Sequence, residues 1–258
     1  FMKALVNLSG KKGLIIGIAN AQSIAYGCAK IFHELEAMLA ITYLNEKAEP
    51  FVRPLAEDLK SPLIIPCDFR ITGQLEAVFD AIKKEWGELD FVLHSVAYAP
   101  QQDLQGRLID CSQSGFLMAM DISCHSFIRL AKIAEPLMKK GGCLLTISFY
   151  GAEKVIQHYN LMGPVKAALE SSVFYMANEL SSQKIRVHAL SPGPIQTRAA
   201  AGLKDFEELI DKVQKDIPSH QLASIEDVGN MAAFLVSDAA SHLTGNIEYV
   251  DSGYHTTG

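Results

Sequence analysis

A tyrosine and a lysine, Tyr159 and Lys166, stand seven positions apart where a segment with helical periodicity, 161–180, begins. Seven residues of α-helix turn through about 700° and rise about 10 Å, so the two side chains share a face if Tyr159 lies in or beside the first turn. A phenol can donate a hydrogen bond to a developing oxyanion, and a nearby lysine stabilises negative charge and can donate to ribose hydroxyls. Taken alone, the spacing is more typical of a half-buried tyrosine beside a surface lysine.

Small residues gather in the turn at 17–25, which joins a short apolar run to a helical pattern. Small residues let the backbone approach a pyrophosphate, and the free N–H groups and dipole of a helix N-terminus favour anions. Ser23 can also cap the helix. The spacing G-x-G-x-x-G is absent, so an ordinary capped turn stays open as an alternative. The small residues are Gly17, Ala19, Ser23 and Ala25.

The turns after the next two apolar runs bear on which nucleotide would bind. An acid at the end of the second strand normally holds the ribose of NAD, whereas an arginine nearby favours the 2′-phosphate of NADP. Leu44 and Asn45 stand there instead, so the lack of an arginine modestly favours NADH over NADPH. After the third run, Asp68 and the neighbouring amides could hold an adenine, although a plain turn accounts for these residues equally well.

These segments are positioned by apolar runs that alternate with helical patterns along the whole chain. Runs without strict alternation indicate strands buried on both faces, as in parallel sheets covered by helices. We therefore predict one α/β domain over 1–258, a Rossmann-like doubly wound parallel sheet with helices on both faces, whose ligand site lies beyond the carboxyl ends of the strands. The predicted strands are 13–17, 38–43, 63–66, 91–95, 143–149, 185–190 and 247–250, and the main helices are 23–35, 72–86, 112–139 and 161–180.

Composition excludes several other classes of protein. With 49% hydrophobic and 20% charged residues the chain is too apolar to be disordered, and no apolar run reaches the roughly 18 residues of a membrane helix. The start lacks the basic-then-apolar pattern of a signal peptide. A net charge of −6 argues against a nucleic-acid binder, which needs a basic face. Five scattered cysteines and histidines without ligand spacing predict reduced thiols, no metal and a cytoplasmic protein.

Five motifs occur together in chain order: Gly17-x5-Ser23-Ile-Ala25-Tyr-Gly27, His94-Ser95, Gly151-Ala-Glu153, the Tyr-x6-Lys pair, and Ser191-Pro-Gly-Pro-Ile-Gln-Thr197. The combination resembles the short-chain dehydrogenase/reductase superfamily and, more narrowly, its enoyl-acyl carrier protein reductases of the bacterial NADH type. Most superfamily members carry Tyr-x3-Lys, and the x6 spacing marks the enoyl reductases. The resemblance extends over the whole chain, to Val250-Asp251-Ser-Gly253.

The resemblance implies a role for each matched position. The thioester carbonyl of the substrate would face Tyr159, and Lys166 would bind the hydroxyls of the nicotinamide ribose. The rest of the NADH cofactor would be lined at its pyrophosphate by Gly17, Ala19, Ser23 and Ile24, at its adenine by Asp68 and Phe69, along its ribose and nicotinamide by Ser95 and Ala97, and at its carboxamide and phosphate by Ile195 and Thr197.

Three positions depart from the family pattern. Many bacterial members place a second tyrosine ten residues before the catalytic one, where this chain has Phe149, and the register set by Gly151 excludes Tyr150 from that role. Phenylalanine there resembles the mycobacterial long-chain branch; we count Phe149 among the catalytic residues because it can gate or orient the substrate, although it cannot donate a proton. The serine of the carbonyl-reducing relatives would fall near Thr146. Ala97 replaces a glycine, and its methyl group should tighten the nicotinamide pocket.

The resemblance implies that the protein reduces the trans-2 double bond of enoyl thioesters, linked to acyl carrier protein, in fatty acid synthesis. A hydride from NADH would reach the β-carbon, Tyr159 would stabilise the enolate, and the α-carbon would then take a proton from water. Two alternatives stay open. One is a short-chain carbonyl (3-oxoacyl) reductase, which the x6 spacing and Thr146 disfavour. The other is a nucleotide-binding relative without turnover.

The segment 196–215 is expected to be a substrate-binding loop that orders on binding, as in the family. Small residues at 199–202 precede an amphipathic pattern, so a fixed surface helix is the alternative. Arg198 and Lys204, which flank the small residues, are the basic residues that could meet an acidic carrier protein. The resemblance also implies a homotetramer, and we expect no nucleic-acid or membrane partner.

Overall fold

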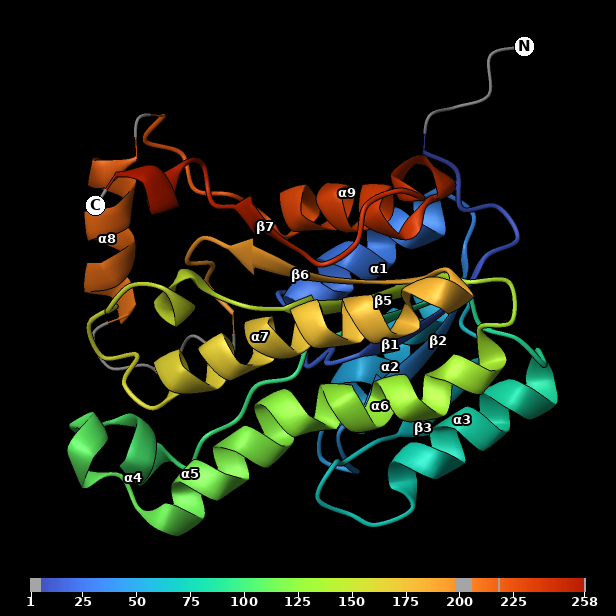
Figure 1. Cartoon of the computed structure of the whole chain (residues 1–258), viewed down its shortest axis with the longest axis horizontal. Coiled ribbons are helices and arrows are strands. Elements are labelled where there is room, and N and C mark those ends of the chain that lie inside the picture. The colour runs from blue at the N-terminus through green and yellow to red at the C-terminus, as the bar shows by residue number, and fades with distance from the viewer. Residues whose placement is uncertain (1–5, 198–205, 218, 258) are drawn as a thin grey trace.

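Seven apolar runs form the strands of one parallel sheet in the computed structural model, which describes residues 6–197, 206–217 and 219–257. The strand order is β3-β2-β1-β4-β5-β6-β7 (Figure 1), which confirms the predicted doubly wound sheet. The chain leaves β1 toward one edge and returns to β4 on the other side of β1, so the order reverses there, where such folds bind ligands. The strands are β1 Lys12–Ile16, β2 Met38–Tyr43, β3 Leu63–Pro66, β4 Phe91–His94, β5 Gly142–Ile147, β6 Ile185–Pro192 and β7 Asn246–Val250.

Helices cover both faces of the sheet, because the strands carry buried apolar side chains on both sides. One face packs against α1 (Ile24–Glu34), α2 (Glu49–Asp58) and α9 (Ile225–Val236). The other packs against α3 (Gln74–Glu85), α5 (Gln113–Met120), α6 (Ser126–Ala134) and α7 (Met162–Leu180). The short α4 (Gln101–Leu104) and α8 (Phe206–Asp216) lie beyond the end to which the strand arrows of β6 and β7 point in Figure 1.

The segment predicted to be helical over 112–139 is helical over 113–137, with two irregular turns that the prediction did not contain. A π-helical turn, Asp121–His125, separates α5 from α6, and a 3-10 turn, Glu135–Leu137, ends the run. Inside the π-helical turn the buried hydroxyl of Ser123 bonds both backbone groups of Tyr98, at 2.8 and 3.0 Å. This contact pins the chain that follows β4, and hydrophobic periodicity contains no signal for it.

Two negative findings apply to the described ranges 6–197, 206–217 and 219–257. No helix there has the length and apolar character needed to cross a bilayer. Nor do three or more His, Cys, Asp or Glu side chains in those ranges come together in a way that could hold a metal ion.

Candidate active site

A cavity of about 700 Å³ lies at the carboxyl ends of the central strands, a size typical of small-molecule sites. The motifs that the sequence spreads over 17–197 meet here, because parallel strands all end at the same edge of the sheet. Every residue predicted for the site lines this cavity: Gly17, Ala19, Ser23, Ile24, Asp68, Phe69, Ser95, Ala97, Phe149, Tyr159, Lys166, Ile195 and Thr197.

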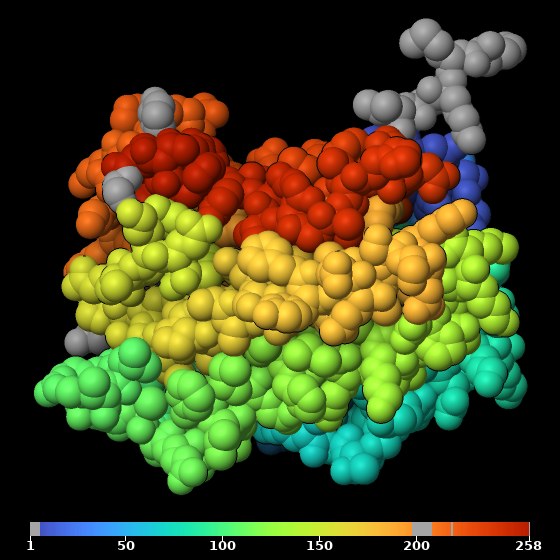
Figure 2. Space-filling model, viewed as in Figure 1, coloured from blue at the N-terminus to red at the C-terminus, as the bar shows by residue number. Residues whose placement is uncertain are grey.

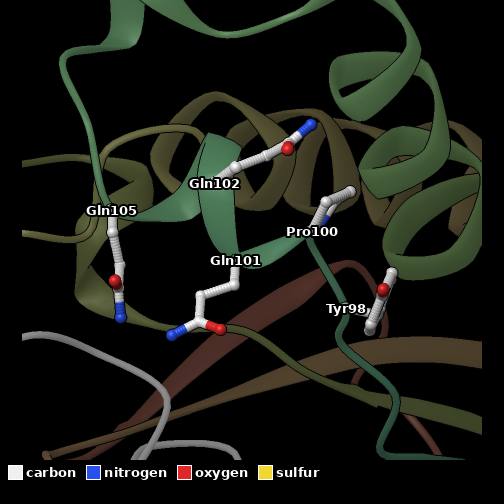
Figure 3. A pocket seen from close by; sticks show the side chains of 5 residues that line it. All are labelled: Tyr98, Pro100, Gln101, Gln102 and Gln105. Atoms are coloured by element: carbon white, nitrogen blue, oxygen red, sulfur yellow. The ribbon is translucent and has the colours of Figure 1, made fainter.

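A second, smaller hollow adjoins the cavity at α4, and Tyr98 and Gln101 line both. Its other walls are Pro100, Gln102 and Gln105. In Figure 3 the amide groups of Gln101 and Gln105 extend to one side of α4 and that of Gln102 to the other. The rim of the cavity on this side is therefore polar but uncharged, and sequence patterns had not singled it out.

The turn after β1 requires glycine at its first position. Gly17 has a φ of +115°, and a Cβ built on it would lie 2.0 Å from the carbonyl oxygen of Ser95. A side chain is excluded both by this contact and by the backbone conformation. Gly17 thus lets the β1 turn and the β4 end close together on the cavity floor, as the small-residue pattern predicts.

Ser23 does not cap α1 with its side chain, and that prediction is wrong. Ser23 occupies the N-cap position, but its Oγ instead accepts from the N–H groups of Ala19 (2.9 Å) and Asn20 (3.1 Å). The hydroxyl therefore organises the turn ahead of the helix. Ile24, the first residue of α1, lines the cavity, so the helix N-terminus, whose first N–H groups lack intrahelical acceptors, lies at the cavity wall.

An ion pair occupies the β3 end of the cavity. Arg70 donates from Nε to Asp68 Oδ1 (2.9 Å) and from Nη2 to Oδ2 (2.6 Å), and its guanidinium lies 5.9 Å from the ring of Tyr98. Hydrogen bonding from the Arg70 side chain holds the pKa of Asp68 below its usual value despite burial. No arginine stands at the end of β2, but Arg70 lines the same cavity from the turn after β3, two positions after Asp68.

At the opposite end, Lys166 of α7 is buried, with 4% of its surface exposed. Its Nζ donates to the carbonyl oxygen of Ile147, at the end of β5, at 2.6 Å. Burial lowers the pKa of Lys166 to about 8, and the carboxylate of Glu170 opposes this shift. The ammonium group is therefore held in a dry environment, where its field acts strongly on a bound anion or oxyanion.

Tyr159 lies in the turn before α7 and not in the helix, so rotation along a helix does not explain its position. The flanking residues His158 and Asn160 have positive φ values of 63° and 40°. Its ring packs edge-on against Phe149 with centroids 4.9 Å apart, and a Cβ on Gly151 would come within 2.4 Å of it. Burial raises the pKa of Tyr159 above its usual value, so the phenol keeps its proton and can donate it in a hydrogen bond.

Two further residues at this end were missed from sequence. Ser148 lines the cavity, and its Oγ donates to the buried carboxylate of Glu170 on α7. Thr146, where the serine of carbonyl reductases was expected, instead donates to the His94 carbonyl oxygen (3.1 Å) and does not line the cavity. A serine two positions after Thr146 thus lines the cavity, and the sequence argument did not consider it. Glu170 stands four positions after Lys166, a helical spacing that could have identified it.

Part of the expected substrate loop falls outside the described residues. Arg198, Lys204 and the small residues at 199–202 are among these, so the thin basic patch stays a prediction. The described part of the amphipathic pattern forms α8, in which Ile210 and Val213 are buried.

Comparisons with known proteins agree with this geometry. Residues 17–255 match the family described as Enoyl-(Acyl carrier protein) reductase. The chain is 44% identical to enoyl-(acyl-carrier-protein) reductase (NADH) 1 of Rhizobium meliloti, over 97% of this chain and 92% of the relative.

Solved structures of enoyl-acyl carrier protein reductases are similar to this chain in both sequence and fold. A reductase of the same name from Anaplasma phagocytophilum, in complex with NAD, is 46% identical with a TM-score of 0.94, covering 97% and 96% of the two chains. One from Bacillus cereus, with NADP⁺ and indole naphthyridinone, is 42% identical with a TM-score of 0.95, covering 97% and 98%.

Proposed function

Because this chain belongs to the enoyl-(acyl carrier protein) reductase family, we propose that it reduces the trans-2 double bond of enoyl thioesters on an acyl carrier protein, with NADH, in fatty acid synthesis. The observation that carries the proposal is the single cavity into which all the predicted residues project, with Tyr159 and Lys166 together at one end. The relatives at about 44% identity are NADH-dependent by name, which supports NADH as the reductant.

The residues present fit a dinucleotide. Gly17 provides the close backbone approach, the start of α1 provides unpaired N–H groups beside Ile24, and the cavity extends from the Asp68 end to the Lys166 end. We assign the pyrophosphate to the Gly17 turn, the adenine to Asp68 and Phe69, and the nicotinamide half to Lys166, Ser95, Ala97, Ile195 and Thr197. When bound, NADH supplies the hydride for the β-carbon of the substrate.

The chain itself stabilises the charge that develops on the thioester oxygen. Tyr159 keeps its proton in its dry setting and donates a hydrogen bond to that oxygen, while the Lys166 ammonium binds ribose hydroxyls and adds a positive field. Phe149 packs on the tyrosine ring and cannot donate, so it orients the acyl chain and excludes water. The α-carbon then takes its proton from water.

Exposed apolar side chains on one face support the proposed homotetramer. Phe174 and Tyr175 of α7 are more than half exposed, and so is Leu117 of α5. Ile128 of α6 is 38% exposed. Figure 2 looks onto α6 and α7, whose side chains lie next to one another on this face. Large exposed apolar patches usually mark contacts between subunits, and sedimentation would measure the assembly.

We further propose that the whole chain is one domain and that 196–215 is its substrate-binding loop. Ile195 and Thr197 line the cavity immediately before it, and α8 follows directly. Amide exchange with and without cofactor tests the loop: protection that does not change on binding would favour the fixed surface helix. We also propose a cytoplasmic location, which the five free cysteines support.

The test of the reaction is oxidation of NADH, followed by absorbance, with enoyl thioesters of several chain lengths on carrier protein and on coenzyme A. We expect turnover with at least one chain length. If NADPH is oxidised faster with an acetoacetyl thioester than NADH is with any enoyl thioester, the carbonyl reductase is favoured. Binding of NADH without turnover of any substrate would favour the non-catalytic alternative.

A further inference from the structure

Two side chains of α7 join that helix to the end of β5. Lys166 donates to the carbonyl oxygen of Ile147 at 2.6 Å, and one helical turn later Glu170 accepts from the hydroxyl of Ser148. All four residues are buried. Because Phe149 follows Ser148 directly and packs against Tyr159, these two hydrogen bonds hold the backbone on which the substrate end of the cavity is built.

Glu170 also supplies the strongest negative charge acting on the buried lysine. Burial lowers the pKa of Lys166, and the carboxylate of Glu170 raises it again. Burial in turn raises the pKa of Glu170, while the hydrogen bond from Ser148 and the charge of Lys166 lower it. Each charge therefore stabilises the other in a region of low dielectric, where the interaction of two charges is strongest.

The other titratable groups around this pair do not replace the carboxylate. Cys124 of the π-helical turn faces Lys166, and burial raises its pKa, so it stays a neutral thiol. His94 of β4 is buried with its pKa lowered to about 3, so it carries no charge. Tyr159 is neutral, and Glu153, which raises the pKa of Glu170, is hydrogen-bonded to the hydroxyl of Tyr249 on β7.

We propose that Glu170 is a positioning residue for the reduction: it fixes Ser148 and the backbone leading to Phe149, and its carboxylate keeps the neighbouring Lys166 ammonium charged. The proposal rests on the proposed function, since it assigns Lys166 to the ribose of NADH. It gives Glu170 no contact with substrate or cofactor. Its effects pass through Lys166 and through the β5 end.

Glu170→Gln separates the two effects, because glutamine keeps the size and a hydrogen-bonding group for Ser148 but removes the charge. Without the carboxylate, Lys166 loses its proton at a lower pH. We expect the pH above which NADH binding weakens to move down by about one unit, so that NADH binds about tenfold more weakly at pH 8.5 and within about twofold of the parent at pH 6.5. Titration calorimetry with NADH measures this directly.

Matched variants distinguish this effect from loss of packing. Glu179→Gln alters an exposed glutamate of the same helix and should leave binding unchanged at every pH. Ser148→Ala removes the hydrogen bond but keeps the charge, so it should lower kcat without moving the pH dependence of NADH binding. If Glu170→Gln does not fold, Glu170→Asp keeps the charge and should retain the parental pH dependence with reduced turnover.

Overlapping pH profiles for the parent and Glu170→Gln would overturn the proposal, as would a shifted profile in Ser148→Ala or in Glu170→Asp. The two proposals fail separately. If the parent turns over no enoyl thioester, the proposed function is wrong while the NADH titrations still test Glu170. If the parent is active and the profiles coincide, only the role of Glu170 is wrong.

Discussion

The cavity has a charged pair at each end, and the two pairs are held in different environments. At the β3 end, Arg70 is 48% exposed on its side chain and binds Asp68 through two parallel hydrogen bonds. At the β5 end, Lys166 and Glu170 are both buried, with 4% and 8% of their surfaces exposed. The pKa of Asp68 is displaced chiefly by its partner, whereas those of Lys166 and Glu170 are displaced chiefly by burial.

This difference suits the exposed pair to binding a ligand and the buried pair to stabilising charge in the reaction. A pair with an exposed partner is screened by water and salt and typically contributes about 0 to 1 kcal/mol. Such a pair can orient a ligand, but it adds little to the free energy of binding. In a dry site the same charges act at low dielectric, and removing one leaves the other uncompensated, at a cost of about 3 to 5 kcal/mol. The dry end therefore suits stabilisation of an oxyanion, and variants there should have the larger effects.

The largest effect is expected for Tyr159→Phe at the dry end. The variant loses the hydrogen bond to the developing oxyanion, so kcat for an enoyl thioester should fall by about 100- to 1000-fold. Affinity for NADH should stay within about twofold, because the phenol is not needed to bind it. Steady-state kinetics and NADH titration measure the two quantities. A kcat within threefold of the parent would remove Tyr159 from the proposed mechanism.

Gly17→Ala tests the turn after β1, which lines the cavity between its two charged ends. The new methyl group would lie 2.0 Å from the Ser95 carbonyl oxygen on a backbone with φ of +115°, so the turn must shift. We expect a loss of stability of at least about 2 kcal/mol and weaker NADH binding of at least about tenfold. Thermal unfolding and calorimetry check these values. Ala19→Ser, a change of similar size in the same turn, is the control and should fold normally.

The pH dependence of the parent enzyme tests the dry end without a mutation. The Lys166 ammonium is present below its pKa of about 8 and is lost as pH rises through that value. Accordingly, kcat/KM should be level near pH 7 and decline toward a tenfold loss per unit above pH 8. In Lys166→Arg, whose guanidinium stays charged, the remaining activity should lack this decline. A flat parental profile up to pH 9.5 would contradict the assignment.

The smallest effect is expected at the β3 end. Arg70→Ala should weaken NADH binding by only about threefold, in keeping with an exposed pair. Binding of reduced nicotinamide mononucleotide, which lacks the adenine half, should not change. Added salt should reduce the difference between parent and variant. A tenfold loss, or an equal loss for the mononucleotide, would break the contrast between the two ends.

Much of the fold was predictable because the strands are continuous apolar runs that end at turn residues. The limits of β2 and β3 agree with the predicted ranges, and the other strands differ by one or two residues at their ends. The details that the prediction missed or had wrong concern places where a side chain bonds a group distant in sequence or outside its own element. The π-helical turn forms where Ser123 meets Tyr98, and Ser23 turns away from the helix it was expected to cap.

The residues of the candidate site likewise include some that could be predicted from the sequence and some that could not. The family resemblance, carried by five motifs in chain order, was enough to name the groups that line the cavity, whereas residue types alone left plain turns and a chance spacing open. That order does not identify Arg70 or Ser148 as partners, and only the helical spacing of four residues from Lys166 points to Glu170. Those partnerships depend on which side chains face one another across β3, β5 and α7.

By itself, then, the sequence determined the layered sheet and the edge at which ligands bind, because hydrophobic periodicity is a property of the chain, and its ordered motifs pointed to Tyr159 and Lys166. The tertiary structure alone decided how wet each end of the cavity is. Burial depends on packing from several elements at once, and it lowers the pKa of Lys166, whereas the same packing leaves the side chain of Arg70, the partner of the buried Asp68, 48% exposed.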